Sequence, residues 1–280
     1  MCRFFRYLAR IFFSKFMMVL AVLLFAIFLY VYTFYYTHDV SNPDEQSILR
    51  IGTDGIYPPH SFHDMNGKDQ LIGFDIDLIK EVASRLNLKP VFFETRVSSL
   101  IAGIDIKRYD ILVNVSITPE RKKKYDFSIP YISHNVLLIV RSDENNIHSF
   151  KDIAGRKVSQ ILGTDLFRIA KELGAYVIFS DNFAQSMQLL SNKHADATMT
   201  ADIPFFHFLQ YRHDNDNQFK ITDRREKSSD ISFMMRKGSN KLKKSIDDTL
   251  CAIRSDGTYE KIFEKYFENN DISKMSICVS

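Results

Sequence analysis

The chain has 280 residues, 45% of them hydrophobic, and a formal net charge of +3 at pH 7. This composition is typical of a globular protein with one large core or two smaller ones, and it excludes an intrinsically disordered chain. Four basic residues precede position 16, so the rest of the chain has a formal net charge of −1, which argues against nucleic acid as a partner.

An uncharged apolar run of 21 residues follows this basic segment, at positions 16–36. As a helix it would be about 31 Å long, which is enough to cross the hydrocarbon core of a bilayer. Because basic residues precede the run and acidic residues follow it, we expect residues 1–15 to be cytoplasmic, residues 16–36 to form a transmembrane helix, and residues 37–47 to be a linker to an outer domain. The alternative is a secretory signal that is cleaved from the mature protein.

From position 48 onward, segments with strand periodicity alternate with segments of helical periodicity. The predicted strands are 48–54, 90–95, 109–115, 157–161, 176–180 and 195–200. The predicted helices are 74–87, 98–108, 165–174, 183–193, 240–255 and 258–267, the second with Ser98 or Ser99 as its N-cap. This alternation predicts an α/β protein with parallel sheets and helices on their faces, arranged in two lobes.

The sequence NVSITPER begins where one of these predicted strands ends. Open α/β sheets bind ligands at the carboxyl ends of their strands, so we expect Asn114 and Ser116 at such an edge. Thr118 would cap a short helix that begins at Pro119. The free N–H groups of that helix and the Arg121 guanidinium would together form a pocket for a carboxylate or a phosphate. The alternative is an ordinary helix cap, with Arg121 in a surface salt bridge.

Other candidate binding residues lie at three further junctions between elements. In the loop after the first strand, Tyr57 could cover the apolar part of a ligand or pack in the core, and Asp54 could bind an amine or bond to its own turn. Thr164 and Asp165 join a strand to a helix, and Asp165 is either a cap or a ligand contact. Asp202 has the same two alternatives. Opposite charges that face one cleft would suit a zwitterion.

The sequence offers no metal site and implies no cofactor. It contains no C-x-x-C or H-E-x-x-H motif and no group of cysteine and histidine with metal-ligand spacing. Two of its three cysteines, Cys251 and Cys278, would lie outside the cytoplasm, where oxidising conditions permit a disulfide between them. The alternative is two free thiols.

Five stretches resemble the polar amino-acid-binding proteins that serve bacterial ABC importers. They are LRIGTDGIYPPHSF, LIGFDIDLIKEVASRL, YDILVNVSITPERKKKYDFSIPYI, SFKDIAGRKVSQILGT and IRSDGTYEKIFEKYF. The similarity runs in order from about Leu49 to Phe267. It implies a two-lobed periplasmic-binding-protein fold of type II, which the chain crosses twice and which closes on an amino acid. The lobes would be residues 48–133 with 235–270, and residues 134–234, followed by a tail at 271–280.

The resemblance also implies roles for particular residues. In the family, the arginine of the S-x-T-x-x-R stretch grips the α-carboxylate of the ligand with help from the serine, and these roles fall on Arg121 and Ser116. The aromatic residue of the first loop falls on Tyr57. The acidic residue three positions earlier falls on Asp54, which in binders of basic amino acids meets the side chain. Asp202 would be the amine-binding aspartate after a one-residue shift.

The sequence departs from the family pattern at several of these positions. Asp165 follows Thr164 where many relatives have a second threonine. His60 stands where phenylalanine is common, and Asn114 where serine or glycine is common. These departures indicate an unusual ligand or a loss of amino-acid binding.

The function that the resemblance implies is that of a receptor without catalytic residues, which captures an amino acid for an ABC permease. We expect a monomer, held in the bacterial inner membrane by a single pass with its binding domain in the periplasm, or periplasmic if the N-terminal segment is cleaved. One alternative is an enzyme, because this fold also hosts dehydratases that act on prephenate or arogenate. Another is the sensing subunit of a signalling complex.

Overall fold

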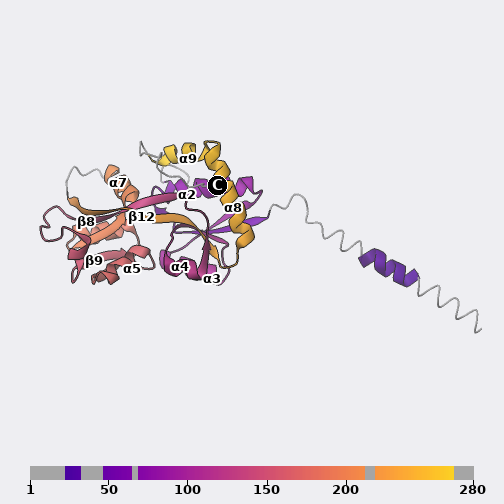
Figure 1. Cartoon of the computed structure of the whole chain (residues 1–280), viewed down its shortest axis with the longest axis horizontal. Coiled ribbons are helices and arrows are strands. Elements are labelled where there is room, and N and C mark those ends of the chain that lie inside the picture. Colours follow the sequence, from indigo (N-terminus) through magenta and orange to yellow (C-terminus); the bar gives the residue numbers. More distant parts are fainter. Residues whose placement is uncertain (1–22, 33–46, 65–68, 212–217, 268–280) are drawn as a thin grey trace, which may run out of the picture. The chain divides into compact units, whose positions relative to one another are not determined.

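The computed structural model describes residues 23–32, 47–64, 69–211 and 218–267 of the chain (Figure 1). The chain divides into two units, residues 1–46 and residues 47–280. All the predicted strands and all but one of the predicted helices lie in the second unit.

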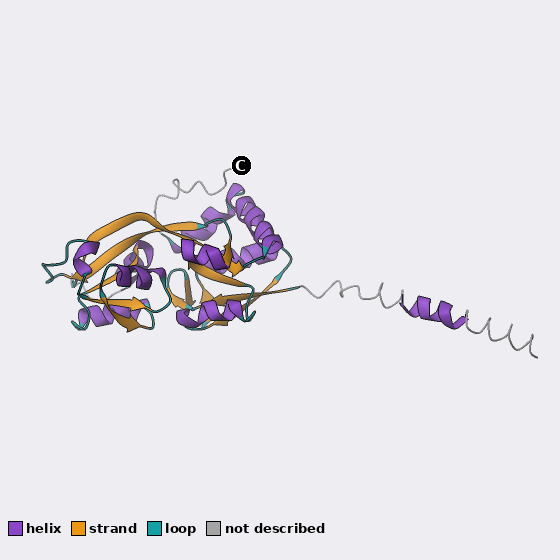
Figure 2. Cartoon of the chain, turned by 60° about the horizontal axis from the view of Figure 1, so that its bottom comes forward, coloured by secondary structure: helices purple, strands orange, loops and turns teal. Residues whose placement is uncertain are grey.

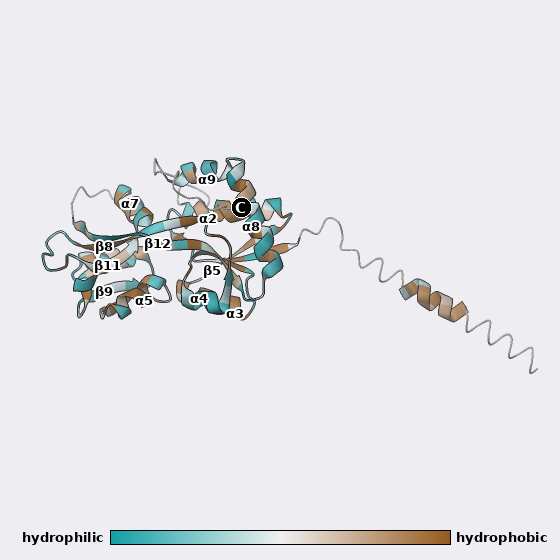
Figure 3. Cartoon of the chain, viewed as in Figure 1, coloured by the Kyte–Doolittle hydropathy of each residue, from teal (hydrophilic) through white to brown (hydrophobic). Residues whose placement is uncertain are grey.

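In the first unit, residues 23–32 form a helix with exposed apolar side chains, which Figure 3 colours as hydrophobic. Among the described residues, no helix is both long enough and apolar enough to span a membrane. The remainder of the predicted 16–36 helix lies outside the described residues. The same holds for residues 1–15, for the linker up to residue 46 and for the tail at 271–280.

The first lobe is built on three parallel strands in the order β5-β1-β6, with helices on both faces (Figure 2). The strands are β1 (Ile48–Thr53), β5 (Lys89–Glu94), β6 (Ile111–Ser116) and the short β7 (Tyr125–Phe127). The helices are α2 (Phe74–Arg85), α3 (Val97–Asp105), α4 (Pro119–Lys124), α8 (Asn240–Ser255) and α9 (Thr258–Tyr266). A separate small sheet contains β2 (Ile56–Tyr57), β3 (Ser61–Asp64) and β4 (Gln70–Ile72).

The second lobe repeats this plan with the parallel order β10-β9-β11. Its strands are β8 (Ile132–Arg141), β9 (Lys157–Ile161), β10 (Tyr176–Ser180) and β11 (Ala197–Ala201). Its helices are the 3-10 turn η1 (Phe150–Ile153), α5 (Asp165–Glu172), α6 (Phe183–Ser191) and α7 (Asp202–Gln210).

A single 18-residue strand, β12 (Phe219–Arg236), belongs to both lobes. It pairs with β8 along residues 219–231 and with β6 along residues 231–235, so the main sheet is continuous through nine strands. Both β12 and β8 run antiparallel to their neighbours. The prediction of purely parallel sheets is therefore wrong at the junction, because these strands pass directly between the lobes without a crossover helix. The division of the chain at 133/134 and 234/235 stays a prediction.

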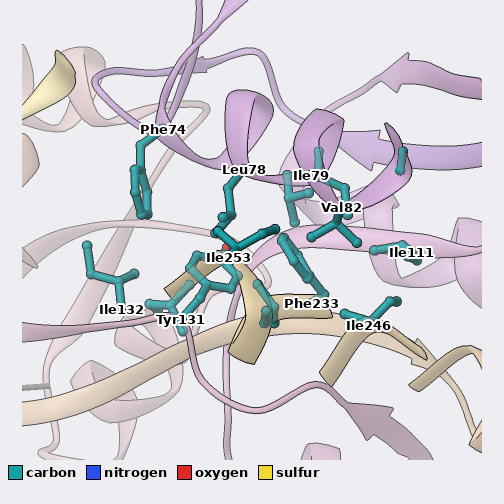
Figure 4. Close-up of a cluster of buried hydrophobic side chains, with 14 of the residues drawn as sticks. Phe74, Leu78, Ile79, Val82, Ile111, Tyr131, Ile132, Phe233, Ile246 and Ile253 are labelled. Atoms are coloured by element: carbon teal, nitrogen blue, oxygen red, sulfur yellow. The ribbon is translucent and has the colours of Figure 1, made fainter. Parts of the chain in front are cut away.

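The main core of the first lobe lies between its sheet and the helices α2, α8 and α9. Apolar residues recur along α2 at helical spacing, which gives it one buried face. Figure 4 shows that face packed against β12 and α8, with Phe74, Leu78, Ile79, Val82, Phe233, Ile246 and Ile253 among the buried side chains.

In the second lobe, successive side chains of strand β8 point to opposite faces of the sheet. Val136, Leu138 and Val140 lie in one buried cluster, with side chains of η1 and α5. Leu137 and Ile139 lie in the other, with side chains of α6 and α7. A nearly continuous apolar run therefore forms a strand that is covered on both sides.

The C-terminal helices return to the first lobe. Lys265 of α9 forms a 2.6 Å ion pair with Asp77 of α2. The Tyr259 hydroxyl donates to the backbone carbonyl of Tyr131 at 2.6 Å. The chain therefore passes from the first lobe to the second and back again, as the resemblance implied.

Two local predictions have different outcomes. The N-cap of α3 is Arg96, which offers no side-chain cap bond, so the prediction of Ser98 or Ser99 is wrong; both serines lie inside the first turn. Cys251 of α8 is disulfide-bonded, while its predicted partner Cys278 lies outside the described residues.

We expect Phe233→Ala to lower the free energy of unfolding by about 3–5 kcal/mol, the usual cost of removing a fully buried aromatic side chain. Phe233 is 0% exposed in the strand that joins the lobes. Urea unfolding measures the change. The control is Phe179→Ala, since Phe179 is 62% exposed and should lose little. Equal losses in the two variants would contradict the described core.

Candidate functional site

Among the cavities between the lobes in the described part of the chain, two share part of their lining, and we call them the main cavity and the side cavity. Their volumes are about 130 Å³ and about 90 Å³. A single water needs only roughly 10–15 Å³ of such volume, so the main cavity has room for a small organic molecule. Six residues from both lobes line both cavities, namely Asp54, Val97, Asn114, Ser116, Thr164 and Asp165.

A β-bulge places Asn114 at the cavity wall. Asn114 has a left-handed φ of 56°, and it shares with Val113 the position opposite Phe233 where the register between β6 and β12 shifts. Asparagine adopts this conformation more readily than most residues. Its backbone N–H donates to the Tyr131 hydroxyl at 2.9 Å, because the bulge removes it from the ladder. Asn114 and Ser116 therefore line the cavities at the end of β6, as predicted.

Arg121 lines the side cavity from the first turn of α4. The helix begins at Pro119, and Thr118 caps it by accepting from the Arg121 backbone N–H at 3.2 Å, which confirms that local prediction. The guanidinium donates to the carbonyls of Ser116 and Gly163, both at 2.9 Å. Burial lowers its pKa. Among the residues that the structure describes, no carboxylate lies within ion-pair distance of Arg121.

Asp54 and Asp165 are the two carboxylates that line the main cavity, and they differ in their partners. Asp165 forms an ion pair with Arg168 at 2.7 Å. Asp54 accepts one long bond from the Ile56 N–H at 3.4 Å and has no cationic partner in the described part of the chain. Burial raises the pKa of Asp54 to about 6, with a further increase from the charge of Asp75.

Asp202 does not line either cavity. It is the first residue of α7, and its carboxylate accepts from the Asn135 side chain at 2.5 Å and from the Ile203 N–H at 3.0 Å. Arg224 lies 3.6 Å away. The structure thus brings the other seven predicted binding residues to the two cavities and leaves Asp202 engaged in contacts within the protein.

Tyr57 and Thr164 have structural contacts as well as positions on the cavity wall. The Tyr57 hydroxyl lies 3.4 Å from the Thr200 hydroxyl of the second lobe, and its ring stacks on His60. Burial raises the pKa of Tyr57. Thr164, and not Asp165, is the N-cap of α5, since its hydroxyl oxygen accepts from the Phe167 N–H at 3.1 Å.

Part of the main cavity wall was not predicted from the sequence. His134 of β8, Gln160 of β9 and Thr200 of β11 line the cavity, and all three are buried. Each lies in or beside a strand with many apolar residues. The available signal was a polar side chain inside a strand that is otherwise buried, since such a side chain needs a partner.

Two α/β lobes that share their longest strand, with a lined cavity between them, define a protein that encloses a small ligand. The chain belongs to the bacterial extracellular solute-binding proteins, family 3, whose model matches residues 49–269. This assignment confirms the resemblance, and the similarity to solved structures confirms the two-lobed fold.

Three proteins illustrate the similarity. A Haemophilus influenzae protein named "Probable amino-acid ABC transporter-binding protein" is 34% identical over 84% of this chain and 91% of its own length. The structure of an ancestral arginine-binding protein bound to arginine has a TM-score of 0.72 at 33% identity, over 79% of this chain and 98% of that one. The ancestral amino acid-binding protein AncCDT-1, described as a precursor of cyclohexadienyl dehydratase, has a TM-score of 0.69 at 33% identity, over 79% and 96%.

We expect Asn114→Val to lower the free energy of unfolding by about 1–2 kcal/mol, because a β-branched residue is strained at a left-handed φ. Asn114→Gly, which tolerates this φ, should stay near the wild-type value. Urea unfolding of both variants checks the difference. Equal stability of the two would show that the bulge relaxes when Asn114 is replaced.

Proposed function

We propose that the protein is a receptor that captures an amino acid between its lobes and delivers it to the permease of an ABC importer. One observation carries the proposal. Arg121 and Asp54 line adjoining cavities, and neither has an ion-pair partner in the described part of the chain. One cation and one anion without partners are the charges that complement a zwitterion.

Arg121 would bind the carboxylate of the ligand, with Ser116 beside it. A guanidinium has five N–H donors, and two of them are used by the carbonyls of Ser116 and Gly163. The remaining donors can form charge-assisted bonds to a carboxylate.

Asp54 would bind the ammonium group. The family pattern gives this role to the position we assigned to Asp202, but that carboxylate is held by Asn135 and does not line the cavities. Asp165 is held by Arg168. Tyr57, Asn114 and Thr164 would complete the enclosure of the ligand.

Contacts across the cleft support capture by closure of the lobes. Arg121 of the first lobe bonds to the carbonyl of Gly163 in the second, and Tyr57 approaches Thr200. Gly163 of the second lobe also approaches the N-terminal end of α3. A Cβ atom added at Gly163 would lie 3.3 Å from the Cα of Ser98. A ligand that bonds to both lobes would favour this closed arrangement.

Attachment to the inner membrane is part of the proposal and rests on the apolar run at 16–36 and the basic residues before it. Tethering a receptor near its permease raises its effective concentration there. We further propose that the binding unit is a periplasmic monomer.

A dehydratase is the alternative, favoured by the similarity to AncCDT-1. It requires a carboxyl group placed as general acid or base. Asp165 is ion-paired, and Asp202 does not line the cavities, so these two are poorly placed. Formation of product from prephenate or arogenate by the purified protein would replace the receptor proposal with this one.

We expect the full chain, purified in mild detergent, to be stabilised by at least one common amino acid. A ligand at a hundred times its dissociation constant adds about 2.7 kcal/mol to folded-state stability. Arg121→Ala should weaken binding at least tenfold, because the carboxylate loses its charged partner. Thermal unfolding with each amino acid measures both effects. The control is Arg108→Ala, which removes an exposed charge from the same lobe. Unchanged binding in Arg121→Ala would refute the assigned role.

We expect ligand affinity to fall as the pH decreases below about 6. The ammonium group favours ionised Asp54, so binding at lower pH must displace a proton from a carboxyl group whose pKa is about 6. The fall approaches tenfold per pH unit, and affinity levels off above pH 7. Calorimetric titration between pH 5 and 8 measures this profile. Asp54→Asn should bind more weakly at pH 7 and lose the pH dependence; the same slope in this variant would assign the effect to another group.

A further inference from the structure

The second-lobe wall of the main cavity contains a buried histidine without a hydrogen-bond partner. His134 is 3% exposed and lines the main cavity. Neither of its ring nitrogens has a hydrogen-bond partner among the described residues. A buried polar group in this condition costs about 1–3 kcal/mol, so its persistence beside a ligand cavity requires an explanation.

The neighbours of His134 do not satisfy it. The edge of its ring meets the ring of His60, with centroids 4.8 Å apart. Its Nδ1 atom lies 3.9 Å from Asp202, which is too long for a hydrogen bond. The Asp202 carboxylate is instead bonded to the Asn135 side chain. No group among the described residues satisfies the imidazole, and the residue lines the main cavity, where a bound ligand would lie beside it.

The wall of the main cavity is mostly apolar, and Gln160 and Ser186, two of its polar side chains, are bonded within the protein. Gln160 donates to the Met199 carbonyl at 3.1 Å, and Ser186 shares a 2.6 Å bond with Ser180. Burial, with a contribution from His60, holds the pKa of His134 well below its usual value, so the ring is neutral at pH 7.

The two carboxylates of the main cavity are already accounted for. Asp165 is paired with Arg168, and Asp54 is assigned to the ammonium group. A charged ligand side chain in this cavity would lose its hydration without gaining a counter-charge, which is costly. A neutral side chain that can hydrogen-bond would satisfy the imidazole without this cost.

We propose that His134 determines the specificity of the receptor for the ligand's side chain, by selecting a neutral amide or hydroxyl group that hydrogen-bonds to its imidazole. The inference rests on the proposed function, because it requires that an amino acid occupies the main cavity. It adds a residue from outside the predicted set and a ligand class: zwitterions with neutral, polar side chains.

The wild-type protein tests the ligand class directly. The full chain in mild detergent is titrated with two near-isosteric pairs, glutamine with methionine and threonine with valine, and with arginine and glutamate. We expect the polar member of at least one pair to bind ten or more times more tightly than its apolar partner, and more tightly than arginine or glutamate. Equal binding within both pairs, or a preference for a charged side chain, would overturn the inference.

Two substitutions test the residue. His134→Leu removes the nitrogens at similar volume, and it should reduce the preference within the selected pair to about twofold or less. His134→Gln, which keeps a donor and an acceptor, should restore most of the preference. The control is His194→Leu, since His194 is exposed and lies outside the cavity. An unchanged preference in folded His134→Leu, or an equal loss in the control, would contradict the role of His134.

These outcomes separate the two proposals. If no amino acid binds to the wild-type protein, both the proposed function and this inference fail. If amino acids bind in a manner that depends on Arg121 but the pairs are not distinguished, the function stands and the role of His134 is wrong. If His134→Leu does not fold, equal binding within both pairs by the wild-type protein would still overturn the inference, and a loss of the preference in His134→Gln would still contradict the role of the residue.

Discussion

Strand β12 is the constraint on which the rest of the structure depends. It pairs with β8 in the second lobe and with β6 in the first, and it contributes Phe233 to the first-lobe core. Because one strand pairs with strands of both lobes, the ends of β6, β9 and β11 are held facing a common space. The cavities lie in that space, and their polar side chains come from segments far apart in the sequence. The Asn114 bulge arises on β6, opposite this same strand.

The polar groups at the cleft illustrate a tension between stability and binding. Burial raises the pKa of Asp54, and His134 has no hydrogen-bond partner among the described residues. Each such group costs folding free energy that an apolar replacement would recover. In contrast, Asp165 and Asp202 are satisfied by contacts within the protein. Of these four residues, the two with fewer hydrogen bonds and ion pairs within the protein, Asp54 and His134, are the ones we assign to the ligand.

Much of the fold is visible in the sequence because local patterns decide it. Helix α2 has one apolar face, and the cap at Thr118 needs only its neighbours along the chain. Strand β12 was not predicted, because its middle reads TDRREKSS and its pairing partners are distant in sequence. The first-lobe side of the candidate site was predicted from strand ends and loops. Gln160 and His134 were missed, since only the tertiary structure shows which side of a buried strand faces a cavity.

The return of α8 and α9 to the first lobe has a mechanical consequence. The second unit, residues 47–280, begins with β1, and its described part ends just after α9. Both elements belong to the first lobe. The chain before residue 47 is therefore joined directly to that lobe. The main chain enters the second lobe through β8 and returns through β12, so that lobe can rotate relative to the first without pulling on the N-terminal segment.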